Sequence, residues 1–137
     1  MPVICQTFYV SRARAPFDES AVRAILESAR RHNPPTGISG CLLFSGRCFA
    51  QVLEGERAVV DSLAARIVTD RRHHAVRFLH RASRSEREYA DWPMGYLHDV
   101  SLEDDLETLL LIPDRSPVVV ADVMERMRPG PVMGALR

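Results

Sequence analysis

Phe49-Ala50-Gln51-Val52-Leu53-Glu54-Gly55 is the stretch of this 137-residue chain that decides the fold. It is typical of a β-strand that ends at a glycine. Side chains alternate across a strand, so Phe49, Gln51 and Leu53 share one face, which is otherwise apolar. A primary amide on that face needs partners for two donor hydrogens and one acceptor oxygen, or its burial costs stability. The stretch therefore predicts a strand with a hydrogen-bonding group lying against Gln51.

Hydrophobic periodicity predicts the elements on either side of this strand. Apolar residues alternate in the expected strands and recur every three to four residues in the expected helices. Asp18 or Ser20 can cap the first helix, and Pro34 ends it near Asn33, because the residue before a proline disfavours helical geometry. The predicted strands cover residues 3–11, 38–44, 47–54, 75–82 and 95–98; the predicted helices run from the cap to about residue 33 and over 57–69, with at most one helical turn at 86–91.

This order of elements, β-α-β-β-α-β-β, predicts an α+β fold, a ferredoxin-like sheet with two helices on one face. Residues 102–128 predict two further short helices separated by Pro113, which fit the opposite face. Strand 3–11 is apolar on both sides, as a sheet covered on both faces requires. We expect a main domain over residues 1–100 and a C-terminal helical extension, or cap, over 101–137. The apolar residues expected in the cap are Leu106, Leu109, Leu110, Val120, Val123, Met124 and Met127.

The composition is that of an ordinary globular domain and argues against several classes of function. The 18 basic and 18 acidic residues give a net charge of +0, unlike a purely electrostatic nucleic-acid or membrane binder. No stretch approaches the roughly 20 apolar residues of a membrane span, and no signal-peptide pattern is seen. The three cysteines, Cys5, Cys41 and Cys48, are expected to be buried free thiols, as in a cytoplasmic protein. The cysteines and histidines show no zinc-type spacing, so no metal site is expected. If Ser45-Gly46 turns the hairpin, Cys41 falls near Ala50.

Three polar residues are each bracketed by apolar positions on their own element. Gln51 lies on a strand, Tyr9 lies on a strand that can neighbour it, and Asn33 ends the first helix. Each of them alone also fits a core polar group that has found a local partner. Together they suit a flat heteroaromatic ligand held between two helices, because such a ligand needs apolar walls and a few amides at its ring edge.

The sequence resembles the BLUF domains, blue-light sensors that bind FAD. The resemblance covers about residues 3–97, and Pro34-Pro35 departs from the family pattern by stiffening the exit of the first helix. It is carried by Phe8-Tyr9-Val10-Ser11, His32-Asn33 with Gly37-Ile38-Ser39-Gly40, Phe49-Ala50-Gln51-Val52-Leu53-Glu54-Gly55, Asp70-Arg71-Arg72-His73-His74 and Asp91-Trp92-Pro93-Met94.

The resemblance implies a role for each matched residue. Asn33 would hydrogen-bond the flavin ring near its C4 carbonyl, and Gln51 would contact both the flavin N5/O4 edge and Tyr9. Met94 or Trp92 would lie near Gln51 and pass the change to the last strand. The other cofactor-binding residues are expected to be Ile25, Ser28, Phe49, Arg66, Asp70, Arg72 and His73.

The implied function is that of a blue-light photoreceptor that binds FAD non-covalently, with FMN or riboflavin as substitutes. Tyr9 would give an electron, and through Gln51 a proton, to the light-excited flavin. Recombination would leave Gln51 rotated or tautomerised and the flavin absorption shifted slightly to the red until dark decay. The chain ends soon after the sensor, so we expect no enzyme activity, and output through a downstream protein partner or a homo-oligomer, without nucleic acid or membrane.

Other interpretations stay open at this point. Arg66 and Asp70 also fit an i,i+4 helix ion pair, and Trp92 and Met94 also fit core positions. The whole chain could be a flavin-free ferredoxin-like protein-interaction module. An RNA-binding sheet would need a basic and aromatic pattern that the central strands lack, and an acyl-phosphate hydrolase would need an Arg–Asn oxyanion pair that is not seen. The residues that could form a partner surface or pack on the sheet are Val118, Val119, Val120 and Met127.

Overall fold

A computed structural model describes residues 3–15, 19–112 and 116–129 of the chain. The predicted order of elements and the α+β class are confirmed. Among the described residues, no helix combines the length and the apolar character needed to cross a bilayer. The elements are β1 (Ile4–Ala13), α1 (Glu19–Thr36), β2 (Ser39–Phe44), β3 (Cys48–Gly55), α2 (Arg57–Val68), β4 (His73–Arg84), β5 (Gly95–His98), the 3₁₀ turn η1 (Val100–Leu102), α3 (Glu103–Leu111) and α4 (Ser116–Arg126).

The five strands form one sheet in the order β4-β1-β3-β2-β5. Strand β1 pairs antiparallel with β3 and β4, and β2 pairs antiparallel with β3 and parallel with β5. The register places Tyr9 opposite Gln51, Gln51 opposite Leu42, and Leu42 beside Tyr96. Paired residues point to the same face of a sheet. These four side chains therefore form one row across the sheet on a single face.

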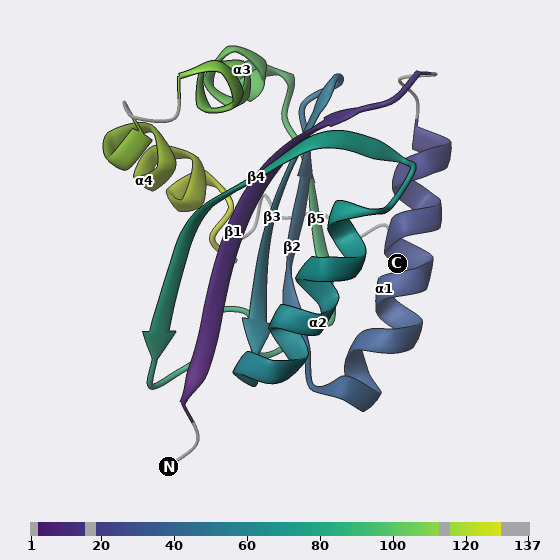
Figure 1. The fold of residues 1–137 in the computed structure, drawn as a ribbon, viewed down its shortest axis with the longest axis vertical. Helices are drawn as coiled ribbons and strands as arrows, with labels where there is room; N and C mark the ends of the chain where they lie inside the picture. Colours follow the sequence, from purple (N-terminus) through teal and green to yellow (C-terminus); the bar gives the residue numbers. More distant parts are fainter. Residues whose placement is uncertain (1–2, 16–18, 113–115, 130–137) are drawn as a thin grey trace.

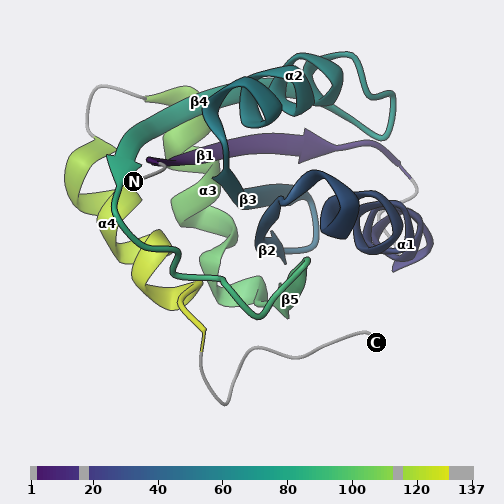
Figure 2. The ribbon, with the colours of Figure 1, turned by 90° about the horizontal axis from the view of Figure 1, so that it is seen from below.

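The sheet is covered on both sides, as its apolar strands predict. Figures 1 and 2 show α1 and α2 on one face and α3 and α4 on the other. Val22 and Leu26 of α1 and Val60 of α2 are buried against the first face. Both helices thus turn apolar residues toward the sheet, in line with the helical repeat of apolar residues in the sequence. We call this side the helix face and the opposite side the cap face.

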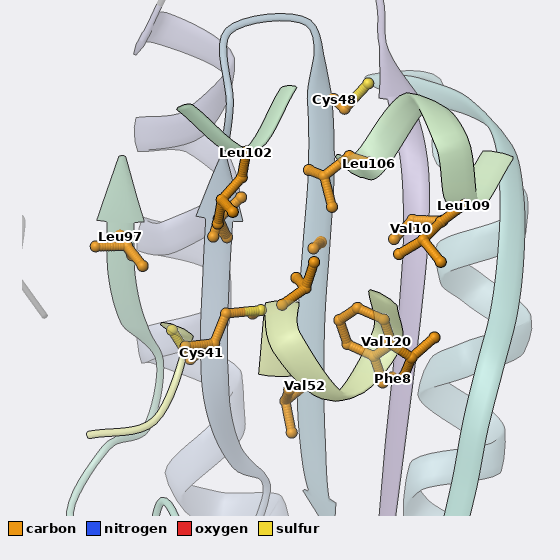
Figure 3. Packing of buried hydrophobic residues seen from close by; sticks show 14 of the residues in the cluster. Phe8, Val10, Cys41, Cys48, Val52, Leu97, Leu102, Leu106, Leu109 and Val120 are labelled. Carbon is orange, nitrogen blue, oxygen red and sulfur yellow. The ribbon is translucent and has the colours of Figure 1, made fainter. Parts of the chain in front are cut away.

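The cap face is closed by tight apolar packing. Phe8 and Val10 of β1 meet Leu106 and Leu109 of α3, and all four are fully buried (Figure 3). The predicted cap residues all join this cluster. Val118 is 71% exposed, so burial against the sheet explains its neighbours but not Val118 itself. The predicted apolar residues of the cap found in the cluster or packed against it are Leu106, Leu109, Leu110, Val120, Val123, Met124 and Met127, and Val119 packs beside them.

Helix α1 continues one turn beyond the predicted end, through Pro34 and Pro35 to Thr36. The prediction that Pro34 ends the helix is wrong: the helix runs to Thr36 and ends just before Gly37. Gly37 has a φ of 74°, its N–H donates to Pro34 O (3.3 Å), and the next N–H donates to Asn33 O (3.1 Å). This is the Schellman arrangement that satisfies the last carbonyls of a helix. Of the two predicted caps, Asp18 lies outside the described residues and Ser20 lies inside the helix.

The β2–β3 hairpin turns over a longer loop than a Ser45-Gly46 turn would give. Phe44 pairs with Phe49, so Cys41 lies opposite Val52 and not near Ala50 as predicted. A Cβ at Gly40 would lie 2.0 Å from Val52 O, which explains the glycine at this point of the hairpin. All three cysteines are buried and free, as predicted.

Strand β4 begins two residues before its predicted start, at His73. Its register with β1 shifts between Val10 and Arg12, and Ala75 in this region has a φ of 55°. A bulge of this kind interrupts the alternation that the prediction depends on. Residues 86–91 form bends and a turn and no helical turn. The predicted separator of α3 and α4, Pro113, lies outside the described residues.

Candidate functional site

A cavity of about 220 Å³ lies between α1, α2 and the helix face of the sheet. Most of its lining is apolar side chains from both helices and from β2 and β3, with amide, hydroxyl, carboxylate and guanidinium groups at intervals. The residues predicted to bind a cofactor all line it: Tyr9, Ile25, Ser28, Asn33, Phe49, Gln51, Arg66, Asp70, Arg72 and His73. The fold therefore brings together residues that lie up to 64 positions apart in the sequence.

Gln51 is at the centre of the polar contacts on the floor of the cavity. The Tyr9 hydroxyl donates to Gln51 Oε1 (2.5 Å), and Gln51 Nε2 donates to Met94 Sδ (3.3 Å). Burial raises the pKa of Tyr9 well above its usual value, with Asp70 adding to the rise and Arg72 opposing it. The phenol is therefore a neutral donor. Gln51 has a second amide hydrogen with no partner among the described residues, and the side chain lines the cavity.

Asn33 supplies the second amide of the cavity, from the last turns of α1. Its Nδ2 donates to the backbone oxygen of Pro93 (2.7 Å), and it is only 4% exposed. Within the part of the chain that the structure describes, Asn33 Oδ1 accepts no hydrogen bond. An amide with one end anchored and the other end facing a cavity can read the edge of a polar ring.

The charged end of the cavity lies where α2 gives way to β4. Asp70 accepts from Arg72 through both carboxylate oxygens, with Nη2–Oδ2 at 2.6 Å and Nε–Oδ1 at 3.0 Å. The Arg72 guanidinium lowers the pKa of Asp70. Helix α2 ends at Val68, so Asp70 is beyond the helix and the alternative Arg66–Asp70 helix pair does not form. Among the described residues, the Arg66 side chain has no hydrogen-bond or ion-pair partner and is available at the rim of the cavity.

His73 is part of the wall rather than a polar contact in the cavity. Its Nε2 lies 2.7 Å from Ile67 O and its Nδ1 lies 2.8 Å from Ser11 Oγ. A carbonyl can only accept, so Nε2 carries the proton, and burial lowers the pKa of His73 so that the ring is neutral at pH 7. Ser11 then donates to Nδ1. Both ring nitrogens are used, and the ring offers its edge to Tyr9 at a centroid distance of 6.0 Å.

Met94 and Trp92 occupy different sides of the sheet. Met94 lines the cavity and contacts Gln51. Trp92 is half-buried against the cap-face cluster and does not line the cavity. Of the two candidates for the place beside Gln51, the structure therefore has Met94 there.

Several cavity residues were not among the predicted binding residues. The helical repeat could have revealed His32 and Thr36, which follow Ile25 and Ser28 along one face of α1 at spacings of three to four residues. The others are apolar residues that also fit a plain core: Ala29, Ile38, Leu42, Leu53, Val59, Leu63 and Ile67. Their residue types do not distinguish the wall of a cavity from an ordinary hydrophobic core.

The residues of the cavity fit a flavin. Apolar walls from α1, α2 and β3 suit a flat ring system, and the unengaged amide groups of Asn33 and Gln51 suit an imide edge. Arg66, which has no partner among the described residues, suits a phosphate. No metal was predicted, and although Cys48, Glu103 and Glu107 bring ligand atoms within 4.8 Å of one another, Glu107 is paired with Arg12.

Comparison with known proteins shows a family relationship. The family model "Sensors of blue-light using FAD" (BLUF) matches residues 4–95. The β subunit of the photoactivated adenylate cyclase of Euglena gracilis is 37% identical over 87 residues, which are 63% of this chain and 10% of the relative. The α subunit is 35% identical over 81 residues, 59% of this chain and 8% of the relative. The chain thus spans about a tenth of the length of these curated relatives.

Solved structures show the same fold. The dark-state structure of the BLUF protein BlrB has a TM-score of 0.74 and 28% identity, covering 91% of this chain and 95% of BlrB. BlsA in its photo-activated state has a TM-score of 0.79 over 96% of this chain and 99% of BlsA; at 24% identity it shows the fold alone. BlrP1 of Klebsiella pneumoniae, solved with manganese and cyclic diGMP, has a TM-score of 0.68 and 31% identity over 88% of this chain and 32% of BlrP1. The chain belongs to the BLUF family of flavin-binding blue-light sensors.

Proposed function

We propose that this chain is a blue-light photoreceptor that binds FAD non-covalently between α1 and α2 and signals by rearranging the hydrogen bonds of Gln51. One observation carries the proposal: the Gln51 amide bridges the Tyr9 hydroxyl and the Met94 thioether while it lines the cavity. A group bound in the cavity would therefore share one amide with a phenol on the neighbouring strand.

Three kinds of side chain would hold the flavin. The amides of Asn33 and Gln51 would bond the polar edge of the ring, and Ile25, Phe49 and Leu63 would form its apolar walls. The groups near the end of α2 that suit the ribityl-phosphate tail are Arg66, Asp70 and Arg72. FMN and riboflavin have the same ring and would bind as substitutes for FAD.

A bound flavin supplies absorption of blue light and, once excited, strong oxidising power. Tyr9 would then give one electron to it and release its hydroxyl proton by way of Gln51, and both would return to Tyr9 on recombination. No net oxidation and no bond to the protein remain. Gln51 is left turned or tautomerised, with its donor and acceptor ends exchanged. A buried hydrogen bond is worth about 1 kcal/mol net, which is enough to bias a two-state element without unfolding the protein.

Tyr9 is the tyrosine best suited to this step. An oxidised phenol must release its proton, so it needs an acceptor that can take part in proton transfer. Tyr96 lies in the same row of the sheet, but its buried hydroxyl has no partner in the described structure. Tyr89 donates to the backbone oxygen of Met127, on the cap face. Tyr9 alone of the three donates to a side-chain amide.

We propose that residues 1–100 form the flavin-binding unit and that residues 101–137 act as a helical cap. The output would then pass to a downstream protein partner or through a homo-oligomer, with no enzymatic turnover by this chain. The alternative function is a flavin-free protein-interaction module, in which the cavity would be a packing defect with no ligand. It predicts a colourless protein that does not take up flavin.

Light spectroscopy of the purified protein tests the proposal. We expect a yellow protein whose flavin absorption shifts to the red under blue light and returns in the dark. Tyr9→Phe should keep flavin but lose this photocycle, because the donor hydroxyl to Gln51 is gone. Tyr96→Phe is the matched control, since it removes a hydroxyl from the same row of the sheet that has no described partner. A Tyr9→Phe protein that cycles like its parent would exclude Tyr9 as the donor.

A further inference from the structure

Three successive backbone carbonyls just before β5 are each held by hydrogen bonds from a different group. The Gly40 N–H donates to Trp92 O (3.0 Å), and the Asn33 amide donates to Pro93 O (2.7 Å). The Arg30 guanidinium donates to Met94 O through Nε (3.2 Å) and Nη2 (3.1 Å). Two of these three donors come from one face of α1, because Arg30 and Asn33 are spaced i,i+3.

The residue held in this way is the one that contacts Gln51. Pairing of β5 with β2 begins at Gly95, so Met94 is the last residue before the ladder and its carbonyl is not fixed by a neighbouring strand. Two guanidinium donors converge on that carbonyl instead. The Met94 side chain is 2% exposed and its sulfur accepts from Gln51 Nε2. Hydrogen bonds from a guanidinium to a backbone oxygen are charge-assisted and directional. They fix the position of the Met94 backbone better than packing of the flexible methionine side chain does.

We propose that Arg30 is a positioning residue of the photocycle: it holds Met94 against the Gln51 amide and so sets how fast Gln51 returns to its dark orientation. The inference rests on the proposed function of Gln51. In the orientation of Gln51 seen here, its Nε2 donates to Met94 Sδ. If Met94 is held less firmly, Gln51 gains less from this hydrogen bond when it turns back in the dark. Arg30 does not line the cavity, and its effect on the ring is exerted through Met94.

The test is Arg30→Met, which keeps an unbranched side chain of similar helix propensity but removes its donors. In the flavin-bound protein we expect flavin content and the red shift to be retained. We expect thermal return in the dark to be slowed about fivefold, the factor that corresponds to one lost hydrogen bond. Amide hydrogen exchange of residues 94–98 in the dark should be faster than in the parent. Arg31→Met is the matched control, because it removes the same charge from an exposed position of the same turn.

Arg30→Lys keeps a charge and a donor, and its rate of return should lie between those of the parent and of Arg30→Met. It also replaces Arg30→Met if that variant does not fold. Unchanged or faster return in the variant that is used, or a slowing shared by Arg31→Met, would overturn the proposal. If the parent itself binds no flavin or shows no red shift, the proposed function fails; unchanged exchange at residues 94–98 with a normal parent photocycle refutes the role of Arg30 alone.

Discussion

Gln51 on β3 and Gln6 on β1 are both buried, at 5% and 1% exposure, but they point to opposite faces of the sheet. The Gln6 amide nitrogen donates to two carboxylates, Glu54 Oε2 (2.9 Å) and Glu88 Oε1 (3.3 Å). Turning it over would place its carbonyl oxygen against those carboxylates. Gln51 instead lies between a hydroxyl, which can donate or accept, and a thioether. Whether a buried amide can switch is therefore decided by the chemistry of its neighbours, and not by residue type or burial.

The same contrast extends to the two faces as a whole. On the helix face, side chains of α1 and α2 leave a cavity above the row that contains Gln51. On the cap face, β1 and β3 meet α3 and α4 in closed packing (Figure 3). Ser45 Oγ donates to Glu103 Oε1 at 2.9 Å and so ties α3 to the hairpin. The helix face therefore leaves room for a ligand, whereas the cap face is closed.

Replacing each glutamine in turn separates the roles of the two buried amides. Gln51→Leu should keep flavin but abolish the red shift, because no amide remains to exchange its ends. Gln6→Leu should keep the full red shift and lower the free energy of unfolding by about 1–2 kcal/mol, since Glu54 and Glu88 each lose a donor. Difference spectra under blue light and urea unfolding in saturating flavin measure the two effects. A normal shift in Gln51→Leu would remove the mechanism proposed for this residue.

The second prediction compares packing on the two faces by shortening one leucine on each. Leu109→Ala on the cap face should lower the free energy of unfolding by about 2–5 kcal/mol, the usual cost of a cavity in a closed core. Leu63→Ala, at a half-buried position in the wall of the cavity, should cost less than about 2 kcal/mol and should mainly weaken flavin binding. Urea unfolding and flavin titration measure both. Equal losses of stability would mean that the helix face is packed as tightly as the cap face.

The sequence predicted the centre of the site because the signal there is local. An amide on an apolar strand face is visible in Gln51 alone, and the antiparallel register then sets Tyr9 directly opposite it. The two-sided covering of the sheet follows from the apolar residues on both faces of β1. These features depend on residues a few positions apart, which periodicity describes well.

The features that the sequence could not predict depend on where each helix ends and on the path of the chain between elements. The Arg66–Asp70 pair fails because α2 ends between its members, and a glycine rather than Pro34 ends α1. Trp92 and Met94 lie in a bend before β5, where alternation gives no face. Arg30 resembles any surface charge on a helix until the fold brings Met94 O within its reach.

The smallest expected effect comes from removing one hydroxyl on the cap face, and it tests whether that face influences the photocycle. Tyr89, on the cap face, is 1% exposed and donates to Met127 O at 3.0 Å, at the end of α4. Tyr89→Phe should lower the free energy of unfolding by about 1 kcal/mol, because one buried hydrogen bond is lost. It should leave the red shift and its dark return unchanged, unlike Tyr9→Phe. If Tyr89→Phe alters the photocycle instead, then the bend between Tyr89 and Met94 couples the faces, and the cap face takes part in the switch.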